Sequence, residues 1–162
     1  MKSIILFRHG ESDFNLDFNQ DHERPLTLSG IKDVGKMGKY LAQKNELPNL
    51  VISSTAVRAK TTAEIAMDIG KWPCNIVLES KIYGGKPKFL LNLIQNQDNK
   101  LLSICLVGHE PNFSRFIAES TDSDYLQFPT ATMAKINFDV NSWKKITMGF
   151  GNLIWIVSPK EL

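Results

Sequence analysis

Short apolar runs alternate with longer segments of helical periodicity along this chain. Four of the runs are too short for helices and end at turn or polar residues, as buried strands do; they cover residues 4–7, 49–54, 75–78 and 101–107. Between these runs, apolar positions recur at helical spacing. We expect four helices, the first with Ser29 as its N-cap and running toward Asn45, the others starting near Val57, Pro87 and Pro111.

The order of these elements indicates the fold class. Strands and helices alternate, which is typical of an α/β protein built as a three-layer α/β/α sandwich with a mostly parallel central sheet. Gly35 and Gly38 weaken the first helix, so we expect them to permit close packing on the sheet. The alternation in residues 133–138 and the apolar stretch 146–157 predict one or two closing strands, partly antiparallel. We expect residues 1–162 to form a single domain.

Composition and charge narrow the classes of function. The chain is 43% hydrophobic and 22% charged, as in ordinary globular proteins. Its net charge of +2 is too small to indicate nucleic-acid binding, and no apolar run approaches the roughly 18 residues of a membrane span. A strand directly after Met1 leaves no place for a secretory signal, and two cysteines are too few for a disulfide framework. We therefore expect a cytoplasmic protein, a monomer, with Cys105 as a buried free thiol.

Four residues that suit phosphate chemistry stand at the ends of the expected strands. Arg8 and His9 end the first strand, Arg58 lies in the first turn of the helix after the second, and His109 follows the fourth. Because the carboxyl ends of parallel strands meet at one edge of a sheet, we expect these side chains to line one crevice. Two guanidiniums, two imidazoles and the amino ends of two helices would make that crevice a phosphate site.

The same four residues predict a reaction. Cations around His9 should disfavour its protonated form and leave a neutral ring nitrogen free to attack phosphorus. We expect phosphoryl transfer to His9 and then to water, with the cations stabilising the charge on the equatorial oxygens. Taken singly, His109 is more often a capping or core histidine and Arg58 a solvated helix residue, so the prediction depends on their coincidence. A non-catalytic phosphate-binding module stays open as an alternative.

Three separated motifs resemble the histidine phosphatase superfamily, the fold class of cofactor-dependent phosphoglycerate mutase. They are residues 8–12 (RHGES), residues 53–63 (SSTAVRAKTTA) and residues 107–109 (VGH). The resemblance covers nearly the whole chain. It implies that His9 is the phosphorylated nucleophile and that Arg8, Arg58 and His109 bind the phosphoryl group.

Further segments resemble one branch of that superfamily, the SixA-type protein-phosphohistidine phosphatases. They are residues 24–27 (RPLT), residues 108–114 (GHEPNFS) and residues 129–131 (PTA), although Thr130 stands where this branch would have glycine. Glu11, Ser12 and Asn15 are closer to the mutase-like branch, where residues at the positions of Ser12 and Asn15 help to hold phosphate. The resemblance implies a phosphorylated protein as the partner.

The identity of the substrate depends on whether the site has a proton donor. Phosphate-ester members of the superfamily carry an acid between the second and third motifs, and Glu79 is the candidate here, although an exposed loop carboxylate is an equal interpretation. An alkoxide needs such an acid, whereas imidazole, with a pKa of about 6.5, leaves more easily. We therefore favour a phosphohistidine-bearing signalling protein over a small phosphate ester or phosphoanhydride. No metal or organic cofactor is expected, and His22 is interpreted as a solvated loop histidine.

Overall fold

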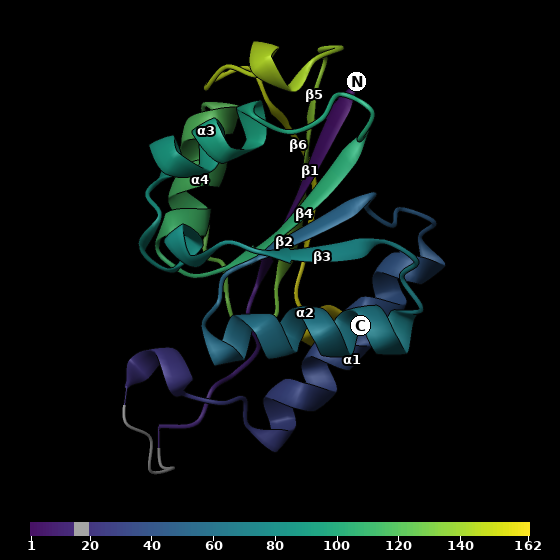
Figure 1. Ribbon diagram of the computed structural model, residues 1–162, viewed down its shortest axis with the longest axis vertical. Coiled ribbons are helices and arrows are strands. Elements are labelled where there is room, and N and C mark those ends of the chain that lie inside the picture. The colour runs from purple at the N-terminus through teal and green to yellow at the C-terminus, as the bar shows by residue number, and fades with distance from the viewer. Residues whose placement is uncertain (15–19) are drawn as a thin grey trace.

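A six-stranded sheet forms the middle of the molecule, with the strands in the order β3-β2-β4-β1-β5-β6 (Figure 1). The computed structural model describes residues 1–14 and 20–162. The strands are β1 (Lys2–Arg8), β2 (Leu50–Ser53), β3 (Asn75–Leu78), β4 (Ser103–Gly108), β5 (Met133–Phe138) and β6 (Asn152–Val157). The first four run parallel to one another, β5 is antiparallel to β1, and β6 is antiparallel to β5. The expected mostly parallel sheet with antiparallel closing strands is confirmed.

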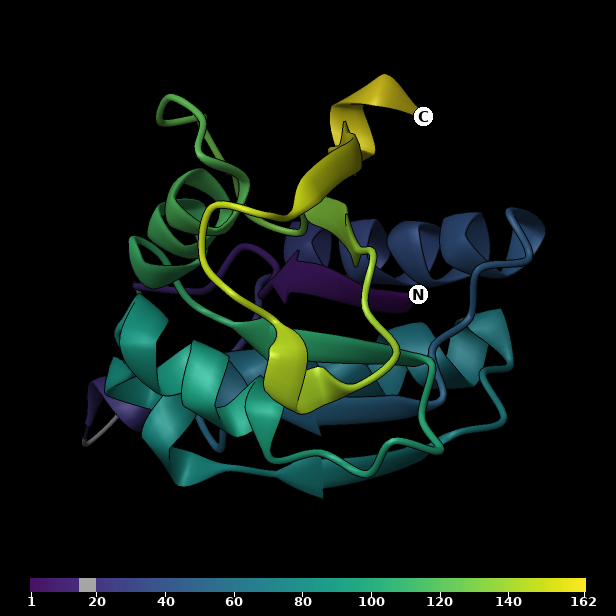
Figure 2. The same ribbon diagram turned by 90° about the horizontal axis from the view of Figure 1, so that it is seen from above.

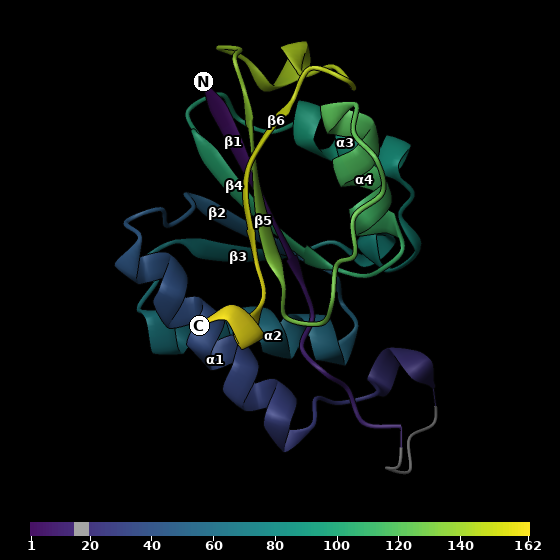
Figure 3. The ribbon, with the colours of Figure 1, turned by 180° about the vertical axis from the view of Figure 1, so that it is seen from behind.

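Two helices cover each face of this sheet. One face carries α1 (Leu28–Gln43) and α2 (Val57–Gly70), and the other carries α3 (Pro87–Gln95) and α4 (Asn112–Thr121), as Figures 1 and 2 show. The three-layer α/β/α architecture is therefore confirmed. Short 3-10 helices connect these elements: η1 (Asp21–Glu23), η2 (Ser80–Gly84), η3 (Trp143–Lys145) and η4 (Pro159–Glu161). The last of these lies against α1 near the C-terminus (Figure 3). No helix in the part of the chain that the structure describes is long and apolar enough to cross a membrane.

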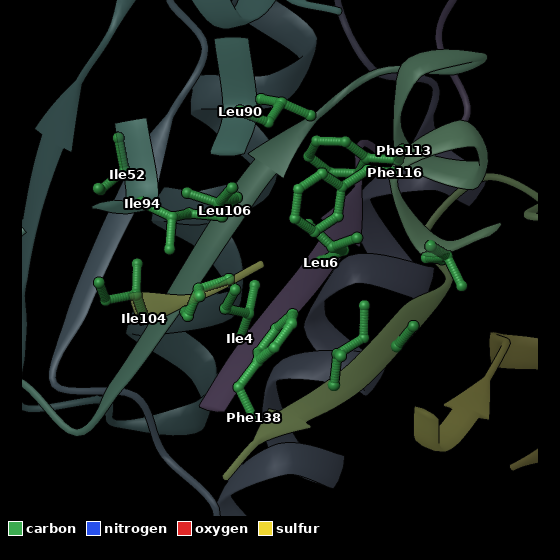
Figure 4. Close-up of a cluster of buried hydrophobic side chains, with 14 of the residues drawn as sticks. Ile4, Leu6, Ile52, Leu90, Ile94, Ile104, Leu106, Phe113, Phe116 and Phe138 are labelled. Carbon is green, nitrogen blue, oxygen red and sulfur yellow. The ribbon is translucent and has the colours of Figure 1, made fainter. Parts of the chain in front are cut away.

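The sheet separates two hydrophobic cores, and β1 contributes to both. Ile4 and Leu6 pack among residues of α3 and α4, while Ile5 and Phe7 pack among residues of α1 and α2; all four are fully buried. Figure 4 shows the first of these clusters, with Phe113 and Phe116 of α4 next to Leu6. A strand that is buried on both faces reads as a continuous apolar run, which explains the sequence pattern before Arg8. Cys105 is buried and free, as expected.

The close packing expected of Gly35 and Gly38 is present, but its partner is α2 and not the sheet. A Cβ added to Gly38 would overlap the backbone of Ala66, and one added to Gly35 would lie 2.8 Å from Cδ1 of Ile69. The two glycines therefore let α1 and α2 approach each other on the same face of the sheet.

Two element ends differ from the sequence expectation for local reasons. The N-cap of α1 is Thr27 and not Ser29, because the Thr27 hydroxyl accepts a hydrogen bond from the backbone N–H of Gly30 at 2.9 Å. The fourth strand begins at Ser103 and not at Leu101. Its first residues are held by Asn49, whose side-chain oxygen accepts from the backbone N–H groups of Leu102 and Ser103 at 2.9 Å.

Candidate active site

The register of the sheet brings the two predicted histidines together. Arg8 of β1 pairs with Gly108 of β4, and the backbone N–H of His9 donates to the Gly108 oxygen at 3.1 Å. The residue that follows each of these strands is a histidine, and the ring centroids of His9 and His109 lie 5.2 Å apart. The expectation that parallel strand ends would place these groups side by side is met.

One cavity of about 230 Å³ lies at this edge of the sheet, and most of the predicted site residues line it. Its lining includes Arg8, His9, Ser12, Arg58 and His109. The remaining predicted phosphate-binding residue, Asn15, lies outside the described residues. The cavity is small and three arginines line it, which suits one tetrahedral oxyanion.

His9 is held in the form that a nucleophile needs. Its Nδ1 donates to the backbone oxygen of Gly10 at 2.7 Å, which leaves the lone pair on Nε2. Burial, together with the charges of Arg58, Arg8 and Arg24, lowers the pKa of His9 to about 4, although the hydrogen bond to Gly10 acts in the opposite direction. The expectation that nearby cations keep this ring neutral is right in direction, but burial is the larger cause.

His109 has one nitrogen engaged and one free. Its Nε2 lies 2.8 Å from the hydroxyl oxygen of Ser54, and that oxygen also accepts from the backbone N–H of Ala56 at 3.2 Å. The Ser54 O–H is thus available to donate to Nε2, and in that tautomer Nδ1 carries a proton with no partner in the described structure. Burial, with His9 and Arg58 as further causes, lowers the pKa of His109 to about 3.

The two predicted arginines approach His9 from different elements. Arg8 donates through Nη1 to the backbone oxygen of Phe128 at 3.0 Å, and its buried Nε has no partner within the described residues. Burial lowers the pKa of Arg8. Arg58, in the first turn of α2, directs Nε toward His9 Nε2 at 3.4 Å. Both guanidiniums therefore retain donor capacity beside the nucleophile.

A third arginine, Arg24, belongs to the site although the sequence reasoning assigned it no role. It is only 6% exposed, lines the cavity, and its Nη1 donates to the hydroxyl of Ser12. An isolated bridge between Ser12 and Leu26 brings the two ends of the intervening segment together and places Arg24 over the strand tips. The one available signal was the RPLT segment, whose place in space cannot be read from local pattern.

Asp21 and Tyr83 form a second layer beside the arginines. The Asp21 carboxylate lies 3.0 Å from Arg58 Nη2 and 3.0 Å from Arg24 Nη2, and it accepts from the Tyr83 hydroxyl at 2.5 Å. The Tyr83 hydrogen bond, followed by those arginines, lowers the pKa of Asp21 to about 2, and the same bond raises the pKa of Tyr83. The tyrosine ring stands edge-on to His109 at 5.3 Å.

His22 is not the solvated loop residue that the sequence suggested. It is half-buried, its Nε2 lies 2.9 Å from the hydroxyl of Thr55, and its ring stands edge-on to Tyr83 at 5.1 Å. These contacts arise because η1 folds back onto the start of α2. His22 therefore helps to fix the segment that carries Asp21.

The sequence and the fold of this chain are similar to those of known proteins. Residues 4–80 match the model of the histidine phosphatase superfamily, branch 1. An uncharacterized protein of Mycobacterium tuberculosis is 27% identical over 164 residues, which cover 94% of this chain and 99% of the relative. A 2,3-bisphosphoglycerate-dependent phosphoglycerate mutase of Mycobacterium leprae is 39% identical over 72 residues, 43% of this chain and 29% of the mutase.

The fold is shared with solved proteins over almost the full length of this chain. The protein histidine phosphatase SixA, solved in complex with tungstate, has a TM-score of 0.82 and 24% sequence identity, and the match covers 98% of both chains. This likeness establishes a phosphoglycerate mutase-like fold. The similarity to histidine phosphatases thus consists of the sequence match over residues 4–80 and of the fold of the whole chain.

Glu79, the candidate acid, lies outside the cavity, which agrees with the alternative interpretation as a loop carboxylate, and two other glutamates line the cavity. Glu79 caps η2 and accepts from the backbone N–H of Lys81 at 3.1 Å. Glu11 and Glu110 line the cavity, but the first accepts from the Thr27 hydroxyl at 2.9 Å and the second from the Ser114 N–H at 2.7 Å. Across residues 1–14 and 20–162, no group of three or more His, Cys, Asp or Glu side chains could hold a metal ion.

Proposed function

We propose that this protein is a phosphatase that works through phospho-His9 and that its substrate is a protein carrying phosphohistidine. The observation that carries the proposal is His9 Nε2, a neutral nitrogen whose lone pair accepts a long hydrogen bond of 3.4 Å from Arg58 Nε and which lies in a cavity lined also by Arg8 and Arg24. A neutral imidazole is a competent nucleophile toward phosphorus, and the guanidiniums match the charge that builds up on the phosphoryl oxygens.

The reaction has two balanced steps. In the first, His9 Nε2 forms a bond to phosphorus while the bond from phosphorus to the substrate nitrogen breaks, and the released imidazole takes up a proton from solvent. In the second, water forms the new P–O bond and gives up a proton to solvent, the bond to His9 breaks and restores its neutral ring, and inorganic phosphate leaves. Arg8, Arg58 and the protonated Nδ1 of His109 bind the equatorial oxygens in both steps.

Two features favour phosphohistidine over a phosphate ester. Glu79 lies away from the cavity, and the carboxylates of Glu11 and Glu110 are already engaged as hydrogen-bond acceptors. Imidazole, whose pKa is about 6.5, can leave without a strong positioned acid, and an alkoxide cannot. The structural likeness to SixA, a protein histidine phosphatase solved with tungstate, supports the same substrate class and an oxyanion in this cavity.

The test is a comparison of two substrates, a phosphotransfer domain phosphorylated on histidine and a generic aryl phosphate. We expect the phosphodomain to be hydrolysed with the higher kcat/KM, and Arg58→Lys to lower that value by roughly 10²-fold because lysine lacks the planar fork. Lys39→Arg, at an exposed position of α1 outside the cavity, is the control on the same phosphodomain and should leave kcat/KM unchanged. Hydrolysis of the aryl phosphate alone would contradict the proposed substrate.

A small phosphate ester is the second candidate, and the mutase-like segment together with Ser12 in the cavity favours it. In that case Glu79 is the proposed acid, and Glu79→Gln should lower turnover of the ester by roughly 10²-fold. Glu64→Gln, an exposed carboxylate on α2, serves as the control. An unchanged rate for Glu79→Gln rules that role out.

A further inference from the structure

A groove of about 710 Å³ lies on the face of α3 and α4, and none of the residues that line it lines the phosphate cavity. The two helices lie side by side there (Figures 1 and 3). Its apolar lining includes Leu91 and Met148, both only half-buried, and its charged lining is Lys86, Lys88, Arg115 and Glu119. Apolar side chains that remain open to solvent between charged ones are typical of a binding surface.

The charge of this groove is unbalanced. Lys86, Lys88 and Arg115 are exposed cations, and Glu119 is the one carboxylate that lines the groove with them. The described part of the chain provides no ion pair or side-chain hydrogen bond to any of the three cations, whereas Lys60 and Lys135 elsewhere each pair with a glutamate. A chain with a net charge of only +2 thus concentrates unpaired positive charge at an apolar groove.

The groove adjoins the phosphate cavity through both of its helices. Lys86 follows Tyr83 by three residues, which span at most about 11 Å of chain, and the Tyr83 ring lies 5.3 Å from that of His109. On the other side, Arg115 lies six residues after His109, in the first turn of α4. A protein whose phosphohistidine enters the cavity would therefore extend over this groove.

We propose that the groove between α3 and α4 docks an acidic, amphipathic helix of the phosphohistidine-bearing protein. Such a helix would lay apolar side chains on Leu91 and Met148 and pair its carboxylates with Lys88 and Arg115. Methionine suits this role because its flexible side chain adapts to different partners. The inference deepens the proposed function and rests on it, since it assigns the surface that would recognise the protein substrate.

The experiment is a charge reversal scored on two substrates. Lys88→Glu with Arg115→Glu should raise KM for a phosphotransfer domain phosphorylated on histidine by about tenfold, and added salt should narrow the difference from wild type. The same variant should hydrolyse an aryl phosphate within about twofold of wild type, because neither side chain lines the cavity. The matched control is Lys32→Glu with Lys39→Glu, two exposed lysines on α1 across the sheet.

The outcomes separate this inference from the proposed function. If the KM for the phosphodomain rises no more in the groove variant than in the α1 control, the docking surface is overturned and the proposed phosphatase function still stands. If wild type hydrolyses only the aryl phosphate, the proposed substrate fails. In that case, calorimetric titration with the unphosphorylated domain tests the docking surface independently of catalysis. Binding that is lost in the groove variant and kept in the α1 variant supports the docking surface, and any other result overturns it. Loss of binding to anionic vesicles with no change for the domain also overturns it.

Discussion

Asp21 binds the guanidinium of Arg58 at two points, through its backbone oxygen at 2.8 Å and through its carboxylate at 3.0 Å. The carboxylate is ionised at neutral pH because the hydrogen bond from Tyr83 and the neighbouring arginines hold its pKa near 2. Both terminal nitrogens of Arg58 are therefore engaged by Asp21, and only Nε is directed at His9. A phosphoryl group that enters the cavity must share this arginine with a negative charge.

Asp21→Asn should tighten the binding of inorganic phosphate, because it removes that competing charge and keeps a side chain of the same shape. We expect the dissociation constant to fall by at least about threefold at low salt, measured by calorimetry. Asp68→Asn, an exposed aspartate at the far end of α2, is the control and should leave the affinity unchanged. Equal affinities in wild type and Asp21→Asn would show that Asp21 does not compete with the anion.

Ser54→Ala should impair the reaction through His109. The Ser54 hydroxyl lies 2.8 Å from His109 Nε2, and without it the ring loses the partner that fixes its tautomer. We expect kcat to fall by roughly tenfold, the worth of one buried hydrogen bond. Ser53→Ala is the matched control, since Ser53 is equally buried but its hydroxyl donates only to the backbone oxygen of Ser54. Similar losses in both variants would indicate a general packing defect.

The neutral state of His9 predicts a pH dependence of stability. Its pKa is about 4 in the folded protein and about 6.5 in an unfolded chain, so between these values the unfolded state binds the extra proton. The free energy of unfolding should therefore be fully retained above about pH 6.5 and decrease as the pH falls toward 4, by roughly 3 kcal/mol for this group.

Urea unfolding at a series of pH values and an NMR titration of the His9 ring measure this effect. His9→Gln should flatten part of the slope because it removes the titrating group. A ring that titrates near pH 6.5 in the folded protein would contradict the buried, neutral nucleophile.

Gly38→Ala tests the contact between α1 and α2, the helix whose first turn carries Arg58. A Cβ at this position overlaps the backbone of Ala66, so we expect a loss of about 1–3 kcal/mol in the free energy of unfolding. Gly84→Ala is the control, because a Cβ there meets no atom within 4 Å. A change of less than about 0.5 kcal/mol in Gly38→Ala would show that the helices can separate without cost.

The site residues at the ends of strands could be predicted from the sequence, whereas those positioned by contacts between loops could not. Arg8, His9 and His109 follow short apolar runs, and parallel strands necessarily bring such ends together. The position of Arg58 could also be predicted, because a helix starts shortly after β2. The local pattern of the sequence was therefore sufficient to predict these four positions.

Arg24, Asp21 and Tyr83 required contacts between segments far apart in sequence. Arg24 reaches the cavity through the Ser12–Leu26 bridge, and Tyr83 reaches Asp21 across 62 residues of chain. Neither contact has a periodic signal. Glu79 shows the converse, since its position after β3 suggested a site residue while its side chain caps the turn that follows.

A phosphoenzyme trap tests the central claim most directly. The protein is mixed with a phosphodomain labelled on its phosphohistidine, quenched in alkali within milliseconds to seconds, digested, and the peptides are analysed by mass spectrometry. The account predicts an acid-labile phosphate on the peptide that contains His9, absent from His9→Ala and retained in His22→Ala. Full turnover by His9→Ala, or turnover without any label on His9, would contradict it.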